Sequence, residues 1–311
     1  MGERTFHVVG TEEFGYSTIN RYWFSFYRYM NIVKRLCELY QYASVNDLKG
    51  YVTHFCYIRL KSFDTLAKVL LEHKDYVSAN CILRMLGDSV AIFRLVYMEP
   101  NPNYRILRHS LYVIDGCERN MAVLPEGDIN KGCIPDKELE LQKKQACFNR
   151  EHRERLMREA QEMLDNSPLK ASDENAFAKI VEDRNWKFKE FKNYKKTGSN
   201  QYKWKDLYEM IGKCENFDVL SYISQYAHGL SMSNLIINLD EQNIDGVLAE
   251  GVGLIDRMID YMSVFFAEER LFILEGLFEP EMRDKILACY DEKHRPTIDQ
   301  WNNMVLSWIH A

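Results

Sequence analysis

Apolar residues recur at steps of three and four along most of the chain, which is the spacing of one face of an α-helix. From about Ser17 to Tyr42 such positions follow one another without a break. Asn46 and Asp75 are capping residues ahead of two further stretches of this kind, the second reaching about Met98. Alternation typical of a β-strand never extends beyond a few residues. The sequence therefore predicts an all-α fold.

The rest of the pattern completes a multi-helix bundle of about ten helices. Proline and glycine in 124–135 indicate a loop, and Pro280 is placed to open a helix at its first position. We expect three parts: N-terminal helices of the bundle in 1–124, a charged helical insertion in 125–170, and C-terminal helices in 171–311. The remaining helices are expected at about 103–123, 136–165, 172–196, around Leu207 and Tyr208, from Asn216 or Asp218 to Gly229, at 245–277, and at 297–309.

Charged residues of both signs fill the segment 136–165 at helical spacing. This pattern is typical of a solvated helix. A protein partner bound through 136–165 as a coiled coil is the other interpretation, although sustained apolar heptads are missing.

Composition agrees with a globular, helix-rich chain, at 46% hydrophobic and 28% charged residues with only 15 Gly and 7 Pro. None of the eight cysteines forms a C-x-x-C pair, so we expect reduced thiols and no metal site. The sequence has no nucleotide-binding loop, and we expect no cofactor. Without a signal peptide or a long apolar run, it predicts a cytoplasmic protein with no membrane contact.

Arg84 and Asp88 are the first candidate site. They lie four residues apart on a strongly apolar helix, so they share one face and can pair. Because buried charge is costly unless it is paired, a structural ion pair is one interpretation and a polar site inside the bundle is the other.

Ser224 and His228 are the second candidate. They share a helix face, and Gly229 follows directly. A histidine in this place is typical of a partner for the helix C-terminus. Alternatively, His228 meets Arg84 or Asp88 and acts as a general acid or base.

The segments ANCILRMLGDSVAIFRLVYMEPN (79–101) and SYISQYAHGLSMSN (221–234) carry a resemblance. They resemble a bacterial all-helical family known as domain of unknown function 5677, with Arg84, Asp88, Ser224 and His228 at its polar positions. Asp88 stands where a glutamate is more usual. The resemblance covers about 40–270 and implies a helical fold without an established activity.

A fainter similarity links the chain to helical RNases of the HEPN superfamily. Their linear signature is an arginine followed by a histidine after four to six intervening residues, and no histidine here has an arginine at that spacing. Arg105 and His109 come closest, with three residues between them. The remaining possibility is an RNase site formed by Arg84 and His228 from distant parts of the chain. With such a site the protein would be a metal-independent RNase or toxin in bacterial defence.

A basic island occupies 184–205, where eight basic residues accompany one acid. The whole chain carries −6 and the island +7, so the remainder carries −13. RNA or another polyanion would be held by ammonium groups and by stacking on aromatic rings. Otherwise Phe188, Phe191 and Tyr194 form a buried helix stripe with solvated lysines outside. The candidate binding residues are Lys187, Lys189, Lys192, Lys195, Lys196 and Trp204.

Taken together, these patterns favour a non-enzymatic binding or interaction protein of unknown ligand, with bacterial origin suggested by the resemblance. Its ligand is expected between the third helix and the helix that ends at His228. The HEPN-like nuclease is the alternative.

Overall fold

The computed structural model describes residues 11–15, 17–42, 44–121, 135–192, 194–195, 200–212, 224 and 241–310. In these residues it contains twelve α-helices and no β-strand, so the protein has an all-α, multi-helix fold, as the sequence predicted. No helix in these ranges combines the length and the apolar character needed to cross a membrane.

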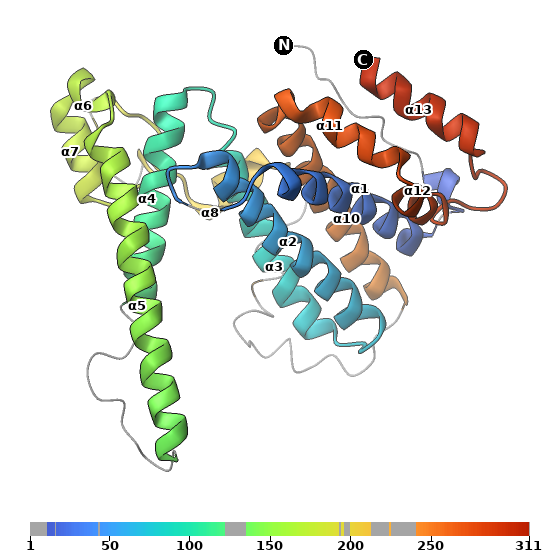
Figure 1. Ribbon diagram of the computed structural model, residues 1–311, viewed down its shortest axis with the longest axis horizontal. Helices are drawn as coiled ribbons and strands as arrows, with labels where there is room; N and C mark the ends of the chain where they lie inside the picture. The colour runs from blue at the N-terminus through green and yellow to red at the C-terminus, as the bar shows by residue number, and fades with distance from the viewer. Residues whose placement is uncertain are drawn as a thin grey trace. The chain divides into compact units, whose positions relative to one another are not determined.

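The chain divides into two compact units (Figure 1). The first comprises 1–42, 52–98 and 204–311, and the second comprises 43–51 and 99–203. The boundaries predicted near 125 and 171 both fall inside the second unit, so that three-part division stays a prediction.

Helix α1 (Thr18–Leu39) packs along α10 (Glu241–Phe265) in the first unit, and α10 also packs on α3 (Tyr76–Val96). Gly251 on α10 permits this close approach, since a Cβ there would lie 2.7 Å from the Tyr22 ring. Tyr22 is fully buried and donates its hydroxyl to the Phe63 carbonyl at 2.8 Å. Aromatic rings therefore fill this core without leaving the Tyr22 hydroxyl unbonded.

A second core in this unit lies between α1 and the C-terminal helices, α11 (Arg270–Glu275), α12 (Pro280–Leu287) and α13 (Ile298–His310). Its largest member is Trp301, which is fully buried and donates Nε1 to the Leu277 carbonyl at 3.0 Å. The remaining helices of the unit are α8 (Trp204–Met210) and α2 (Leu48–Leu71), whose first turn is assigned to the second unit.

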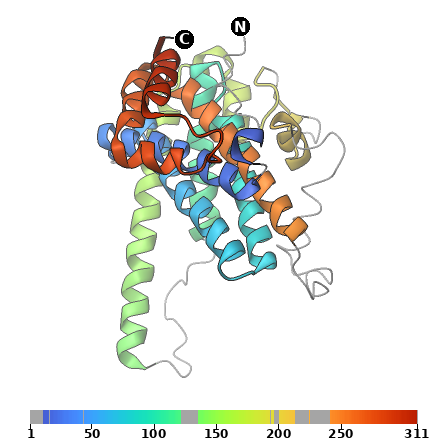
Figure 2. The same cartoon turned by 90° about the vertical axis from the view of Figure 1, so that its right-hand side faces the viewer.

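The second unit is built on α4 (Pro102–Met121) and α5 (Asp136–Asp165), which pack side by side. Both views show α5 as one long helix that runs past α4 (Figures 1 and 2). Two short helices follow, α6 (Leu169–Ser172) and α7 (Glu174–Glu182).

Several predicted boundaries are confirmed. Asp75 caps α3 by accepting a hydrogen bond from the Ser78 amide at 3.0 Å, and Pro280 opens α12. The helix at 136–165 matches α5. At α2 the predicted cap is wrong by one residue, because Asp47 rather than Asn46 accepts from the Gly50 amide.

Two predicted helices are wrong. The stretch 172–196 is helical only as far as Glu182, and the described residues beyond it form turns, a bend and an isolated β-bridge at Phe188. The helix predicted for 245–277 ends at Phe265, where 3₁₀ turns interrupt it before and after α11. The predicted loop at 124–135, apart from Pro135, and the start and end of the helix from Asn216 or Asp218 to Gly229 lie outside the described residues.

Candidate functional site

Arg84 and Asp88 pair on α3, as their spacing predicted. The Arg84 Nη1 lies 3.1 Å from Asp88 Oδ1. Tyr208 on α8 joins them: its hydroxyl accepts from Arg84 Nη1 at 2.8 Å and donates to Asp88 Oδ1 at 3.0 Å. The three side chains therefore form a closed hydrogen-bonded cluster within the first unit.

Gly87 makes room for Tyr208 in this cluster. A Cβ at position 87 would lie 2.5 Å from the Tyr208 Oη. The tyrosine therefore reaches the two charged groups across the bare backbone of α3. Trp204, one turn earlier on α8, places its ring 5.9 Å from the Arg84 guanidinium carbon.

Burial sets the electrostatics of the cluster. It raises the pKa of Asp88 above its usual 3.8, against the opposing effects of Arg84 and the Tyr208 hydroxyl. Burial and the nearby Asp88 carboxylate also raise the pKa of Tyr208. Arg84 is 16% exposed at its side chain and already bonded twice, so an external anion would have to displace Tyr208 to reach Nη1.

The meeting of His228 with this cluster stays a prediction. His228 lies outside the described residues. Ser224 is described as a half-buried helical residue, and the structure brings neither Arg84 nor Asp88 into a hydrogen bond with it.

The basic island differs from the predicted helix stripe. Phe188 pairs with Gln201 as an antiparallel bridge, and the Tyr202 amide donates to the Lys187 carbonyl at 2.8 Å. Phe188 is buried in the second unit at 1% exposure, while Lys189 is exposed and Lys187 is half-buried. We call the described residues of 186–203 the lysine hairpin.

Arg108 on α4 anchors the lysine hairpin. Its Nη1 donates to the Trp186 carbonyl at 3.0 Å, and its guanidinium carbon lies 4.0 Å from the centre of the Phe188 ring. Glu99 balances the buried charge, with its Oε2 3.4 Å from Arg108 Nε. Tyr112 packs edge-on against Trp186 at 5.3 Å.

The lysine hairpin separates phosphate binding by lysines from base stacking by aromatic rings, two roles that the sequence pattern combined. Four of its aromatic side chains are buried and unable to stack on bases, while Tyr202 is half-buried and its ring centre lies 5.3 Å from Lys189 Nζ. Lys189, Lys192 and Lys195 are exposed. Lys196 lies outside the described residues, and Trp204 belongs to the first unit. The buried aromatic residues are Trp186, Phe188, Phe191 and Tyr194.

Tyr208 and Arg108 were not predicted as site residues. In the sequence pattern Tyr208 counts only as an apolar position. Gly87, which lies between Arg84 and Asp88 and has no side chain, is the residue that could have indicated a close contact at this point of the helix. Within the described ranges, no group of three or more His, Cys, Asp and Glu residues is placed to hold a metal ion.

Comparison with protein-family models, with curated proteins and with solved structures finds no match for this chain. The resemblance to the helical family of unknown function therefore stays an expectation drawn from the residues at 79–101 and 221–234.

Proposed function

We propose that the protein is a non-enzymatic binding module that holds a nucleic-acid backbone on its lysine hairpin. The observation that carries this proposal is the separation of charge from aromatic surface in 186–203. Lys189, Lys192 and Lys195 are exposed, while the rings between them are buried.

The exposed lysine ammonium groups favour contact with phosphates. Ammonium groups bind phosphates as point charges and release condensed counterions, without reading sequence. Because the rings of Trp186, Phe188 and Phe191 pack against tyrosines of α4, base stacking adds little to binding. We therefore infer affinity for the backbone with weak preference among bases.

A binding role also fits the Arg84 cluster better than catalysis does. Arg84 and Asp88 are bonded to each other and to Tyr208, so the arginine has a structural role. A nuclease would need that arginine to hold phosphate.

The salt dependence of binding tests the proposal. Fluorescence anisotropy would measure the dissociation constant for single-stranded oligouridylate of about 15 nucleotides, a length within the range of roughly 4–16 that single binding folds cover. Three phosphate contacts predict a slope of log affinity against log salt of about −2. Oligoadenylate should bind within about threefold of oligouridylate, since the rings between the three lysines are buried.

Charge reversal at the lysine hairpin supplies the decisive variant. Replacing Lys189→Glu, Lys192→Glu and Lys195→Glu together should abolish the salt slope. A matched control, Lys61→Glu, Lys137→Glu and Lys293→Glu, changes net charge equally at exposed sites outside the hairpin and should retain most binding. Equal losses in the two triple variants, or no binding by the wild type at low salt, would contradict the proposal.

A further inference from the structure

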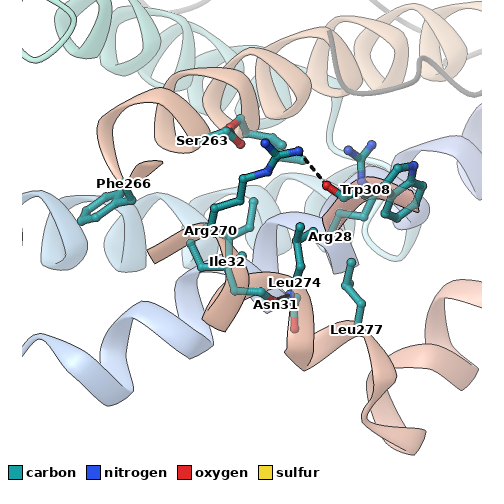
Figure 3. A pocket seen from close by; sticks show the side chains of 11 residues that line it. Arg28, Asn31, Ile32, Ser263, Phe266, Arg270, Leu274, Leu277 and Trp308 are labelled. Carbon is teal, nitrogen blue, oxygen red and sulfur yellow. Dashed lines mark hydrogen bonds between the residues drawn. The ribbon is translucent and has the colours of Figure 1, made fainter. Parts of the chain in front are cut away.

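The pocket among α1, α10, α11 and α13 in the first unit is lined mostly by apolar side chains such as Ile32, Phe266 and Leu274 (Figure 3). Arg270 borders it and donates Nη2 to the Trp308 carbonyl at 2.7 Å, as the dashed line shows. Its volume of about 30 Å³ is the share of one water molecule in the liquid. This pocket therefore admits no organic ligand, whereas the second unit exposes large apolar side chains on the surface of one helix.

That helix is α5, whose N-terminal half runs past the end of α4 (Figures 1 and 2). Arg153 Nε donates to Asn120 Oδ1 at 3.2 Å, one residue before α4 ends. In the half of α5 ahead of this contact, Leu141 is 66% exposed and Phe148 is 64% exposed. Covering these two side chains would remove apolar surface from water, which is favourable.

Six exposed residues of α5 form one stripe along the helix. At about 3.6 residues per turn they fall within roughly 100° of one another around the helix axis. The buried residues Leu139, Ala160 and Leu164 lie on the other side of the helix. We call these six residues the α5 stripe: Glu140, Leu141, Lys144, Phe148, Glu151 and Arg155.

Phe148 lies in the middle of the α5 stripe. Its ring is stacked with that of His152, one turn later, at a distance of 6.4 Å between ring centres. Since the ring stays 64% exposed, this contact covers little of it. Phe148 therefore presents an aromatic face to a partner.

The charges of the α5 stripe are self-complementary. Lys144 and Glu151 lie at equal distances along the helix on either side of a point just before Phe148. Glu140 and Arg155 lie at equal, larger distances from the same point. Consider two antiparallel helices related by a two-fold axis at this point. Lys144 of each copy then lies opposite Glu151 of the other, and Glu140 lies opposite Arg155.

The two cations of the α5 stripe are available for such contacts. Arg155 Nη2 donates to His152 Nδ1 at 3.2 Å rather than to a carboxylate. Lys144 forms no ion pair with any residue that the structure describes. Complementary charges at the edge of an interface fix its register and exclude wrong partners more than they add affinity.

We propose that the α5 stripe is a dimer interface, on which a second copy of this chain lies antiparallel with its Phe148 beside the first. The two phenylalanines supply the apolar contact, and the four charged residues fix the orientation. Lys137 and Arg158, at the next equidistant positions, carry like charges, so the complementary stretch ends at Glu140 and Arg155.

The length of this stretch sets the expected affinity. It spans about 24 Å of helix, so the two copies bury less surface than a permanent dimer does. We therefore expect a weak dimer, with a dissociation constant in the tens of micromolar. Sedimentation velocity of the full-length protein should show monomer at about 1 µM and mostly dimer at about 300 µM.

Charge reversal tests the antiparallel register. Lys144→Glu places two glutamates opposite each other at both ends of the interface and should weaken dimerisation about tenfold. Glu151→Lys places two lysines opposite each other and should do the same. An equimolar mixture of the two variants pairs each glutamate with a lysine, so it should dimerise as the wild type does. The variant that carries both substitutions should also recover.

The matched controls are Lys293→Glu and Glu292→Lys, which change the net charge equally at exposed positions of the first unit. Alone or mixed, they should dimerise as the wild type does. Phe148→Glu should stay monomeric at about 300 µM, because it removes the apolar contact. Urea unfolding at about 1 µM, where the protein is monomeric, should give equal stability for the wild type and all these variants.

The mixing experiment keeps the test decisive even if one substitution impairs folding, because a misfolded chain would not be rescued by the other variant. A wild type that stays monomeric at the highest concentration would overturn the proposal. Single variants that dimerise as the wild type does would overturn it too, as would a mixture that dimerises no better than its components.

Discussion

At the scale of the residue, Gly87 decides how closely Tyr208 approaches Arg84 and Asp88. Alanine at this position would place a Cβ 2.5 Å from the Tyr208 Oη and displace a hydroxyl bonded to both charged groups. We expect Gly87→Ala to lower the free energy of unfolding by about 2 kcal/mol, measured by urea denaturation.

The control for that substitution is Gly246→Ala on α10. Nothing lies within 4 Å of a Cβ there, so alanine should stabilise the helix by about 0.5–1 kcal/mol. Equal effects of the two substitutions would show that Tyr208 does not depend on Gly87.

Only half of this cluster follows from the sequence. Arg84 and Asp88 are neighbours by helical geometry, so their pairing is local and predictable. Tyr208 lies 120 residues beyond Asp88 in the sequence, and its contact with Asp88 depends on how α8 packs on α3. Hydrophobic periodicity predicts that Tyr208 faces inward, but it does not predict which polar group its hydroxyl contacts.

His109 on α4 predicts how stability depends on pH. It is fully buried, donates Nε2 to the Val45 carbonyl at 3.1 Å, and burial lowers its pKa from 6.5 to about 4. The unfolded chain binds the proton more readily in this range. Stability is therefore complete above pH 6.5 and is lost as pH falls toward 4, by roughly 3 kcal/mol.

Urea denaturation across this pH range checks the prediction. His109→Gln should lower stability at neutral pH and remove most of the acid-induced loss. The exposed His73→Gln should leave the pH profile unchanged. An unchanged profile in His109→Gln would exclude His109 as the source.

At the scale of the element, the lysine hairpin shows how a local pattern misleads. Phe188, Phe191 and Tyr194 fit steps of three, a spacing that predicts one stripe of a helix. Trp186, Lys187, Phe188 and Lys189 alternate with a period of two, which is the strand signal. Arg108 and the bridge from Phe188 to Gln201 stabilise the non-helical form, and both contacts join residues that are not neighbours in the sequence.

The helix α5 was predicted from its charge pattern alone, and its burial is uneven. Leu156, at 7% exposure, belongs to the half that is buried together with Ala160 and Leu164, whereas Phe148 is 64% exposed. We expect Leu156→Ala to cost about 3 kcal/mol and Phe148→Ala to stay within about 0.5 kcal/mol. Urea unfolding followed by circular dichroism would measure both, and a larger cost for Phe148→Ala would place a partner surface on α5.

At the scale of the whole molecule, the lysine hairpin is a basic site on an acidic protein. The net charge is −6, so long-range forces repel a polyanion while the hairpin attracts it at close range. The two effects respond differently to solution conditions. Lowering the pH toward the isoelectric point of about 5.8 reduces the net negative charge and with it the long-range repulsion.

We therefore expect nucleic-acid binding to tighten about threefold when pH falls from about 7.5 to about 6 at low salt, because the net negative charge that repels the polyanion decreases toward the isoelectric point of about 5.8. The effect should vanish near 0.5 M salt, where the screening length falls to about 4–5 Å. Anisotropy titrations at the two pH values would measure it. The variant carrying Lys189→Glu, Lys192→Glu and Lys195→Glu should stay weak at both. Binding that weakens as pH falls would mean that the anion is held by groups other than these lysines.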